Sequence, residues 1–499
     1  MTSYLINTMW SKRGTSMRRR WKTNLMFKPD ISKSKEDDPT KQLPVKKILI
    51  LGGGFAGIEV LKRLQKKFKN REDIEITLVS KDNFLLFTPM LPEVASGMIE
   101  TRHIVTPVRE FCKKAKFYEA TVESIDFQNN QVAITHSIGR QSSPSDWDQH
   151  ILKYDYLVIA LGSQNNFFGM SDVQKHAFTM TSIGDAITLR NHVINILEQA
   201  NLEEHNMNLR KDLLTFIVVG GGFNGIETVG EVNHFVRDSI EKYYKNILMT
   251  DVRILLVSAS DKILEQVDEQ LGKYALEKLK QSGVEFIMKH HVKEATPTSA
   301  SLDDGTKINT YTLIWSAGVT PSKLIKELDC EHDRGHRIVT NHYLEVPGYE
   351  GVYAIGDCAS ITNPETGEPY PPTAQHAIPE AKTAAKNIIN SIKKGKASND
   401  SNREKFNYKT KGMMAQIGKR TGVATLFGTK VRGFAAWWLW RTYYLAQLPT
   451  TQKKLKVMGD WTSDLFFRPD VAMIKRREMD IGNDESAHSE KKQSTSIGA

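Results

Sequence analysis

The sequence predicts an α/β protein made of two βαβ units and a C-terminal module of amphipathic helices. Three observations favour this fold class. A glycine-rich turn follows a strand-like apolar run at residues 52–57, and the same pattern returns at residues 220–225. Bulky aromatic residues then recur with helical spacing between residues 434 and 466. The 499 residues suffice for two to four domains, each with a substantial core.

The first unit begins at Val45, where Val-Lys-Lys-Ile-Leu-Ile-Leu leads into the glycine turn. An apolar helical period and a second strand at residues 74–80 complete it. Gly52 permits the tight turn, and Gly54 lets backbone N–H groups approach a pyrophosphate. Gly57 lets the helix pack closely on the strand. This spacing is typical of a Rossmann-type dinucleotide site.

The second unit repeats this order after Leu-Leu-Thr-Phe-Ile-Val-Val, with Gly220, Gly222 and Gly225 at the three corresponding positions. A longer helical segment and a strand at residues 252–258 follow. One such motif is weak evidence. Two copies in the same strand and helix context predict two bound dinucleotides.

Three further apolar runs resemble buried strands, and they end at residues 160–162, 316–318 and 356–357. In flavoproteins with two dinucleotide domains, strands ending in Ala-x-Gly pass beneath each dinucleotide. An Asp after a final glycine there accepts a hydrogen bond from the ribityl chain of FAD. Asp357 is the candidate in this sequence, and an Asp that caps the next helix is the alternative.

Basic side chains are concentrated at both ends of the chain. Residues 1–29 contain seven basic residues and no acidic ones, and residues 409–477 contain 14 basic and three acidic residues. The first segment is typical of a flexible extension or of an organelle transit peptide. In the second, the charges alternate with aromatics, which favours an anionic membrane surface over nucleic acid. There is no run of 18 apolar residues that would predict a spanning helix.

Taken together, these motifs resemble the type II NADH:quinone oxidoreductases, single-subunit flavoenzymes of the respiratory electron-transport chain that do not pump protons. The resemblance runs from about residue 45 to residue 477. Besides the glycine loops, it rests on Phe84-Leu-Leu-Phe-Thr-Pro-Met-Leu-Pro, Ala160-Leu-Gly-Ser-Gln-Asn-Asn, Leu189-Arg-Asn-His, Ala354-Ile-Gly-Asp-Cys, Pro372-Thr-Ala-Gln-His-Ala and Gly433-Phe-Ala-Ala-Trp. It implies FAD at the first loop, NADH at the second, and a quinone co-substrate beside the Ala-Gln segment.

The resemblance also implies the residues of each site, with no metal among the ligands. The expected FAD contacts are Gly52, Gly54, Phe55, Ala56, Gly57, Ser80, Lys81, Thr88, Pro89, Val122, Ala160, Gly162, Gly356 and Asp357. The expected nicotinamide coenzyme contacts are Gly220, Gly222, Phe223, Asn224, Gly225, Glu227, Ser258, Ala317 and Gly318. The expected quinone side consists of Gln375, His376 and Pro379.

Two of these residues are expected to act in catalysis. The Gln375 amide, with a donor and an acceptor, would hold a quinone carbonyl, and a bond to its own helix backbone is the alternative. Glu227, one turn into the second glycine-loop helix, would orient NADH or supply protons to the quinone. A carboxylate that is merely favoured near a positive helix end is the alternative for Glu227.

Three positions depart from the family pattern. Ser258 ends the second strand of the NAD unit, where an acid would bind the adenosine ribose and repel a 2′-phosphate, so the sequence leaves NADPH open. Ser80 is the corresponding, weaker ribose acceptor in the FAD unit. Pro379, followed by Glu380, replaces a second Gln often found in the family, which makes the quinone pocket less well defined than the flavin site.

The aromatic segment supplies the membrane prediction. One expected helix carries Phe434, Trp437, Trp438, Trp440, Tyr443, Tyr444, Leu445 and Leu448, and a second carries Met458, Trp461, Leu465 and Phe466. Lys453, Lys454 and Lys456 are expected between them. Residues 430–470 would therefore lie on a lipid bilayer surface as a monotopic anchor. A dimer interface or an ordinary core is the alternative, and a homodimer is expected.

The predicted domain order follows from these assignments. It is a basic extension (1–43), an FAD-binding domain in two parts (44–170 and 321–408), an NAD(P)H-binding domain (171–320), a membrane-binding module (409–477) and a disordered tail (478–499). The expected location is the inner face of the cytoplasmic membrane, or the mitochondrial inner membrane if residues 1–29 are a transit peptide.

Other functions are less favoured. Sulfide:quinone oxidoreductase shares the plan, but it needs a cysteine pair beside the flavin, and no cysteine occurs between Gly162 and Cys330. Cys112, Cys330 and Cys358 form neither a CxxxxC pair, as disulfide reductases require, nor a zinc-binding pattern. A flavin-bound sensor without turnover would not need the second complete loop. Nucleic acid is not an expected partner.

Overall fold

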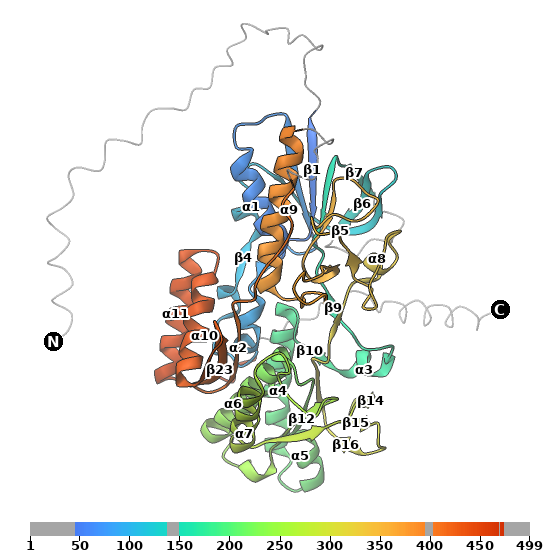
Figure 1. Cartoon of the computed structure of the whole chain (residues 1–499). Helices are drawn as coiled ribbons and strands as arrows, with labels where there is room; N and C mark the ends of the chain where they lie inside the picture. Colours follow the sequence, from blue (N-terminus) through green and yellow to red (C-terminus); the bar gives the residue numbers. More distant parts are fainter. Residues whose placement is uncertain (1–44, 137–148, 395–402, 469, 474–499) are drawn as a thin grey trace, which may run out of the picture. The chain divides into compact units, whose positions relative to one another are not determined.

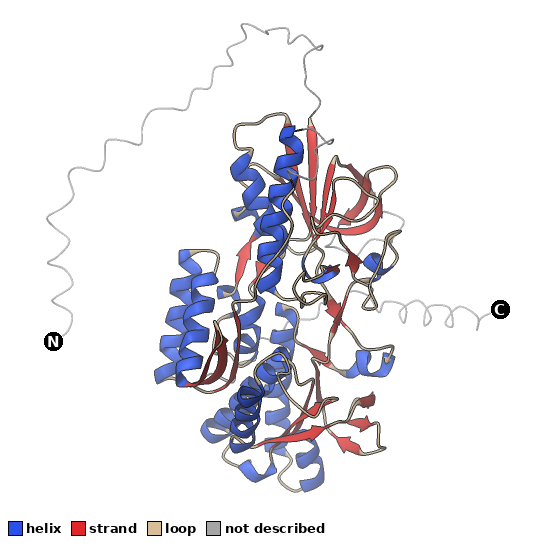
Figure 2. Cartoon of the chain, viewed as in Figure 1, coloured by secondary structure: helices blue, strands red, loops and turns tan. Residues whose placement is uncertain are grey.

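The computed structural model describes residues 45–136, 149–394, 403–468 and 470–473. The predicted extension at residues 1–43 and the predicted tail at residues 478–499 lie outside these ranges. Within the described residues, the chain forms two mainly parallel sheets with helices packed against them, and a C-terminal group of strands and helices (Figure 2).

Among the described residues, the first sheet has the strand order β20-β8-β1-β2-β5-β6-β7. Its strands are β1 (Lys46–Leu51), β2 (Ile74–Ser80), β5 (Lys116–Asp126), β6 (Gln131–His136), β7 (His150–Lys153), β8 (Tyr156–Ile159) and β20 (Val352–Ala354). β1 runs parallel to β2 and β8, its neighbours on either side. This order confirms the strand, glycine turn, helix and strand pattern expected for the first unit.

Helices α1 (Phe55–Lys67) and α9 (Ala374–Lys394) lie side by side against this sheet (Figure 1). The last four residues of β1 are buried, and so are Val60, Leu61 and Leu64 of α1. These apolar positions join the residues of β8, β20 and α9 in one core. The helical spacing of the apolar residues of α1 is thus explained by the packing of this helix into the core of the first sheet.

The second sheet has the order β10-β17-β11-β12-β13 within the described chain. Its strands are β10 (Phe178–Thr179), β11 (Thr215–Val219), β12 (Arg253–Ser258), β13 (Val284–Met288) and β17 (Thr312–Trp315). The surrounding helices are α4 (Ile183–Leu202), α5 (Met207–Leu213), α6 (Phe223–Tyr243) and α7 (Glu269–Gln281). The chain leaves the first sheet after β8, builds this sheet, and returns to the first with β20.

Shorter elements connect and extend the two sheets. They are β3 (Phe84–Leu86), η1 (Thr88–Met90), α2 (Leu91–Ala95), η2 (Thr101–His103), β4 (Val105–Pro107), η3 (Val108–Glu110), β9 (Gln164–Asn165), α3 (Ser171–His176), η5 (Met249–Asp251), β14 (Val292–Thr296), β15 (Ser299–Leu302), β16 (Lys307–Asn309), β18 (Val319–Thr320), α8 (Lys323–Lys326), β19 (Ile338–Val339), η6 (Gly356–Cys358) and β21 (Ala359–Ser360).

The C-terminal module comprises β22 (Gly412–Gly418), β23 (Thr421–Leu426), β24 (Thr429–Gly433), α10 (Phe434–Gln447) and α11 (Thr451–Phe466). β22 packs against α6, and α10 packs against β23. The core of the second sheet continues into this module and into α2. Within the described residues, no helix is both long and apolar enough to cross a bilayer.

The structure corrects the position of the three lysines. Lys453, Lys454 and Lys456 lie within α11, not between the two helices. Helix α11 begins at Thr451, before the three lysines, because the Thr450 side chain accepts a hydrogen bond from the Lys453 N–H and caps the first turn. The lysines therefore belong to the first two turns of a helix.

Most of the large apolar residues of the module fall into two groups. Trp437, Trp440, Leu448 and Trp461 are buried. A second group is exposed, namely Phe434, Trp438, Tyr443, Met458, Leu465 and Phe466. The core alternative thus holds for the first group, and the second group remains available for an apolar environment outside the protein.

Candidate functional site

Both glycine loops bring the backbone against the strand beneath them. A Cβ on Gly52 would lie 2.0 Å from the carbonyl oxygen of Ala160, and one on Gly220 would lie 2.5 Å from that of Ser316. Their φ angles of +108° and +121° lie in the region that favours glycine. Only glycine fits at these two turns.

The third glycine of each loop sets the distance between helix and strand. A Cβ on Gly57 would lie 1.9 Å from the Gly52 carbonyl oxygen, and one on Gly225 would lie 1.9 Å from the Gly220 carbonyl oxygen. Both helices therefore begin directly above the turn that precedes them.

The middle glycines border open space. A Cβ on Gly54 or Gly222 would meet no atom of the described residues within 4 Å. Helices α1 and α6 begin there with no side-chain cap and no acid in the first turn, whereas α4 and α7 have Ser182 and Asp268 as caps. The first N–H groups of α1 and α6 are thus left for a ligand. Two uncapped helix ends with clear space in front fit the pyrophosphates of two dinucleotides.

A serine lies under each loop at the end of the second strand. A Cβ on Gly53 would lie 2.7 Å from Ser80 Oγ, and one on Gly221 would lie 2.7 Å from Ser258 Oγ. Ser258 is buried, and its Oγ accepts a hydrogen bond from the Ser260 N–H at 3.3 Å. Neither loop has an acid at this strand end.

The Gly356–Asp357 turn carries two carboxyl groups. Asp357 Oδ2 accepts a hydrogen bond from Ser163 Oγ at 2.9 Å, and Glu380 Oε2 accepts one from the Gly356 N–H at 2.7 Å. Burial raises the pKa of Asp357, and burial raises the pKa of Glu380 to about 7. Glu380 thereby ties α9 to the turn that holds Asp357.

Glu227 lies where three elements meet. Its Oε1 accepts hydrogen bonds from the Gln416 N–H of β22 at 3.1 Å and from Trp440 Nε1 of α10 at 3.0 Å. Burial raises the pKa of Glu227 to about 8, although the two donors act in the opposite direction. At neutral pH the group holds its proton.

A row of aromatic rings leads from Glu227 to the first glycine loop. The Trp440 and Tyr444 ring centroids are 4.7 Å apart, and those of Tyr444 and Phe87 are 6.0 Å apart. Phe87 in turn lies 5.7 Å from Phe55, the first residue of α1. Helix α10 therefore connects the beginnings of both glycine-loop helices.

The Ala-Gln segment begins α9. Gln375 is partly buried, and among the described residues no hydrogen bond engages its side-chain amide. Pro379, inside α9, has no N–H to offer the Gln375 carbonyl four residues earlier. The side-chain amide of Gln375 is left for another partner.

His376 does not share this availability. Its ring is buried, Nδ1 lies 2.8 Å from Thr373 Oγ1, and Nε2 lies 3.2 Å from Thr410 Oγ1. Burial lowers its pKa. Both nitrogens are taken up by protein, so neither is left to bind a quinone.

The other predicted residues lie around the two loops. Ala56 and Ala160 are buried, Lys81 is exposed at the end of β2, Thr88 and Pro89 begin η1, and Val122 lies at a bulge in β5. Gly162 and Gly318 have positive φ, and the Gly318 carbonyl accepts the Asn166 N–H. Phe223 begins α6, Asn224 Nδ2 donates to Ser316 Oγ at 3.4 Å, and Ala317 follows β17.

Known families match both parts of this architecture. A model described as pyridine nucleotide-disulphide oxidoreductase matches residues 46–381, and one described as NDH2 C-terminal domain matches residues 410–470. A probable NADH dehydrogenase of Dictyostelium discoideum is 33% identical over 87% of this chain and 92% of its own length. A type II NADH:quinone oxidoreductase of Mycobacterium tuberculosis is 30% identical over 86% of this chain and 90% of its own length. The chain belongs to the type II NADH:quinone oxidoreductase family.

Solved structures support the same fold. The NDH2 of Plasmodium falciparum in complex with NADH covers 86% of this chain and 99% of its own, with a TM-score of 0.76 at 21% identity. The sulfide:quinone oxidoreductase of Aquifex aeolicus reaches a TM-score of 0.61 at 15% identity. In this member of the type II family, Cys330 and Cys358 have pKa values raised by burial, to about 11 and about 12. Such thiols are poor nucleophiles.

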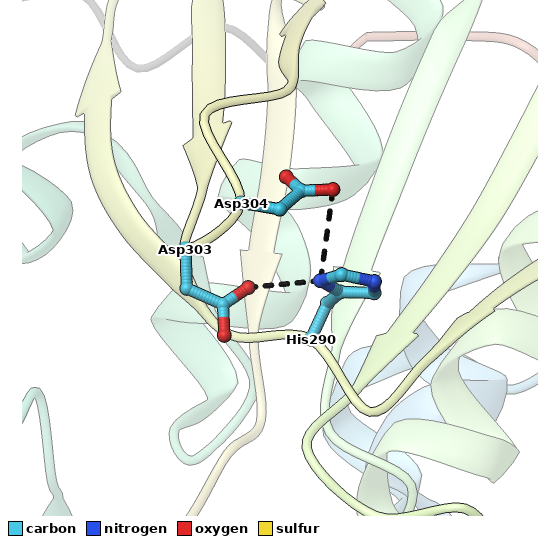
Figure 3. A group of neighbouring side chains, drawn as sticks. All are labelled: His290, Asp303 and Asp304. Atoms are coloured by element: carbon cyan, nitrogen blue, oxygen red, sulfur yellow. Dashed lines mark hydrogen bonds and ion pairs between the residues drawn. The ribbon is translucent and has the colours of Figure 1, made fainter.

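A cluster of metal-ligand type consists of His290, Asp303 and Asp304, none of them a predicted site residue (Figure 3). His290 Nδ1 is 2.9 Å from Asp303 Oδ1 and 3.8 Å from Asp304 Oδ2. Asp304 also accepts the Thr306 N–H, and Asp303 accepts the His291 N–H. These hydrogen bonds tie the β15–β16 turn to the segment before β14, so the cluster has a structural explanation.

The sequence reasoning missed three residues that contact predicted site residues. Glu380 was noted only as a departure, Gln416 was not singled out, and Trp440 was assigned to the membrane face. Glu380 had no local signal, because its partner is the Gly356 N–H, 24 positions away. Gln416 and Trp440 act through contacts with Glu227, 189 and 213 positions away.

Two alanine substitutions in the first loop should affect different properties of the protein, its stability and its retention of FAD. Gly57→Ala should destabilise the flavin-free protein by about 3 kcal/mol, because its Cβ would overlap the Gly52 carbonyl oxygen. Gly54→Ala should change stability by less than about 0.5 kcal/mol and still reduce FAD retention, because its Cβ projects into the space for the pyrophosphate. Chemical denaturation and flavin content after gel filtration measure both. Normal flavin content in Gly54→Ala would contradict the assignment.

Proposed function

We propose that this chain is a membrane-associated flavoenzyme that oxidises NADH, with NADPH as an alternative, and reduces a quinone without pumping protons. FAD would be held at the first glycine loop and the nicotinamide coenzyme at the second. FAD, when bound, supplies the two-electron chemistry that joins hydride donation to quinone reduction. Support for this role comes from family membership and from the two uncapped, open helix ends.

The observation that carries the proposal is the position of Glu227. It follows the second glycine loop, it is bound by the C-terminal module, and a row of aromatic rings links it to Phe55 at the first loop. Quinone reduction consumes protons, and a carboxyl with a pKa of about 8 carries one at neutral pH. Glu227 would hold and release that proton, and Gln375 would position a quinone carbonyl.

We further propose the domain division expected from the sequence. Residues 44–170 and 321–408 would bind FAD, residues 171–320 would bind NAD(P)H, and residues 409–477 would contact a membrane surface. The exposed Phe434, Trp438 and Phe466 support the last assignment. A homodimer and an inner-face location, bacterial or mitochondrial, are part of the same proposal.

Anaerobic stopped-flow absorbance tests the function directly. The purified protein is mixed with NADH, NADPH or sulfide, and then with a short-chain quinone. Rapid bleaching of the flavin by a nicotinamide and its recovery with quinone are expected. Bleaching by sulfide alone would favour the sulfide:quinone oxidoreductase alternative. No bleaching by any donor would favour a sensor.

Glu227→Gln tests the proton-holding role. Because burial keeps Glu227 protonated below about pH 8, the rate of quinone reduction should fall as pH rises through about 8. The variant should lose this alkaline limb and be slower by roughly 100-fold. Trp440→Phe is the control, since removing a donor to the ionised form should raise the Glu227 pKa and shift the limb to higher pH. An unchanged limb in Glu227→Gln would contradict the role.

Ser258→Glu tests coenzyme choice. A carboxylate at the end of β12 should accept a hydrogen bond from the adenosine ribose 2′-hydroxyl of NADH and repel the 2′-phosphate of NADPH. The kcat/KM ratio of NADH to NADPH should rise by at least roughly tenfold. Ser301→Glu adds the same charge on β15 and should leave the ratio unchanged. An equal ratio in wild type and Ser258→Glu would remove Ser258 from the ribose site.

A further inference from the structure

A groove of about 440 Å³ lies between the two helices of the C-terminal module, α10 and α11. Its apolar walls include Phe434 and Trp438 from α10, and Met458 and Leu465 from α11. All four side chains are exposed, between 46% and 60%. Such a continuous apolar lining in water favours an apolar chain as the occupant.

A buried cation lines the same groove. The Arg441 guanidinium lies between two indoles, 4.2 Å from the Trp437 ring centroid and 4.7 Å from that of Trp461. The residue is only 6% exposed, and its Nε has no hydrogen-bond partner among the described residues. A guanidinium clamped in this way is well oriented but incompletely paired.

Two nearby acids do not fully balance this charge. Arg441 Nη2 donates to Met98 Sδ at 2.9 Å, but it is 3.5 Å from Glu93 Oε1 and 4.0 Å from Asp464 Oδ2, both longer than a good charged hydrogen bond. Burial raises the pKa of Glu93 to about 8 and raises that of Asp464 as well. A protonated Glu93 contributes no negative charge at neutral pH.

A second arginine borders the groove. Arg420, on the turn between β22 and β23, is exposed and has no acidic partner among the described residues. Together, Arg420 and Arg441 present two cations to a lining that is otherwise mostly apolar and aromatic. This combination suits a molecule with an anionic head and an apolar chain.

We propose that the groove binds one anionic phospholipid, with an acyl chain along the α10 and α11 walls and its phosphate between Arg420 and Arg441. The inference rests on the membrane association proposed above and adds a defined headgroup site to it. A quinone has a neutral head and would bring no negative charge to either arginine. A second copy of the chain would have to place an acid between them. The phosphodiester group of a phospholipid carries a negative charge and several acceptor oxygens, so it can accept hydrogen bonds from both arginines.

Fluorescence quenching tests the site in the full-length flavoprotein. Vesicles contain phosphatidylcholine and phosphatidylglycerol, with bromine on the acyl chains of one lipid or the other. Brominated phosphatidylglycerol should quench the indoles of the groove more strongly than brominated phosphatidylcholine at the same bromine content. Trp438→Phe should remove part of this signal, because its indole is the exposed one on the wall.

Two charge variants separate a built site from general attraction to an anionic surface. Arg420→Gln, at the exposed rim, should reduce the preference for phosphatidylglycerol by at least roughly tenfold. Lys456→Gln removes an exposed charge of α11 outside the groove, so it should weaken vesicle binding by about fivefold and leave the preference intact. Arg441→Lys keeps the charge but loses the planar stack, and it should also lower the preference.

Each contrary outcome overturns the proposal in a recognisable way. Equal quenching by the two brominated lipids, or equal effects of Arg420→Gln and Lys456→Gln, would leave only diffuse attraction. If the protein binds vesicles without quenching of the indoles and sediments as a dimer, the occupant of the groove is a second copy of the chain. If inorganic phosphate abolishes the preference for phosphatidylglycerol and neither brominated lipid quenches the indoles, the two arginines form a site for a free anion. Activity with a soluble quinone is measured separately, so loss of the enzyme function remains distinguishable from loss of the lipid site.

Discussion

A single carboxyl oxygen joins the parts of the molecule on which the site depends. Glu227 Oε1 receives the Gln416 N–H and Trp440 Nε1–H, so the second glycine-loop helix is bonded to both the sheet and the aromatic helix of the C-terminal module. Burial of the carboxyl favours its neutral form, and the two donors limit how far its pKa rises. Position and protonation of Glu227 are therefore set by the same contacts. Tyr444, which packs edge-on against Trp440, extends this chain of contacts toward the first loop.

The two dinucleotide loops were predictable because their constraints act over short stretches of sequence. A side chain on Gly52 would overlap the carbonyl oxygen of Ala160, and one on Gly57 would overlap the carbonyl oxygen of Gly52. The Gly57 constraint arises within the strand, turn and helix unit itself. Gly220 and Gly225 repeat both constraints in the second unit. Backbone geometry of this kind leaves a fixed spacing of glycines after an apolar strand. The strand and helix bounds accordingly follow the sequence closely in both units.

The contacts that complete the site were not predictable, because they depend on which helix face becomes covered. Trp438 and Trp440 are two residues apart in the same aromatic run, yet the first is exposed and the second is buried against Glu227. Their spacing indicates a helix with aromatic faces but does not say that β23 covers one of them. His376 adjoins Gln375 in the motif, yet it turns into a cage of threonines and tyrosines. The neighbouring residues in the sequence do not indicate which distant residues these side chains will contact.

The C-terminal module is consequently bonded to buried carboxyl groups of α2 and α6, in addition to carrying exposed aromatic residues. Trp461 of α11 donates to Glu93 Oε2, and Glu93 lies beside Arg441 of α10. Gln416 of β22 donates through Nε2 to Glu231 and through its backbone to Glu227, both on α6. These bonds place residues of the module next to three buried carboxyl groups. Without the module those carboxyls would meet water, which favours their ionised forms. Burial behind this helix pair raises the pKa values of all three groups, so moving the pair would change the surroundings that set the pKa of Glu227.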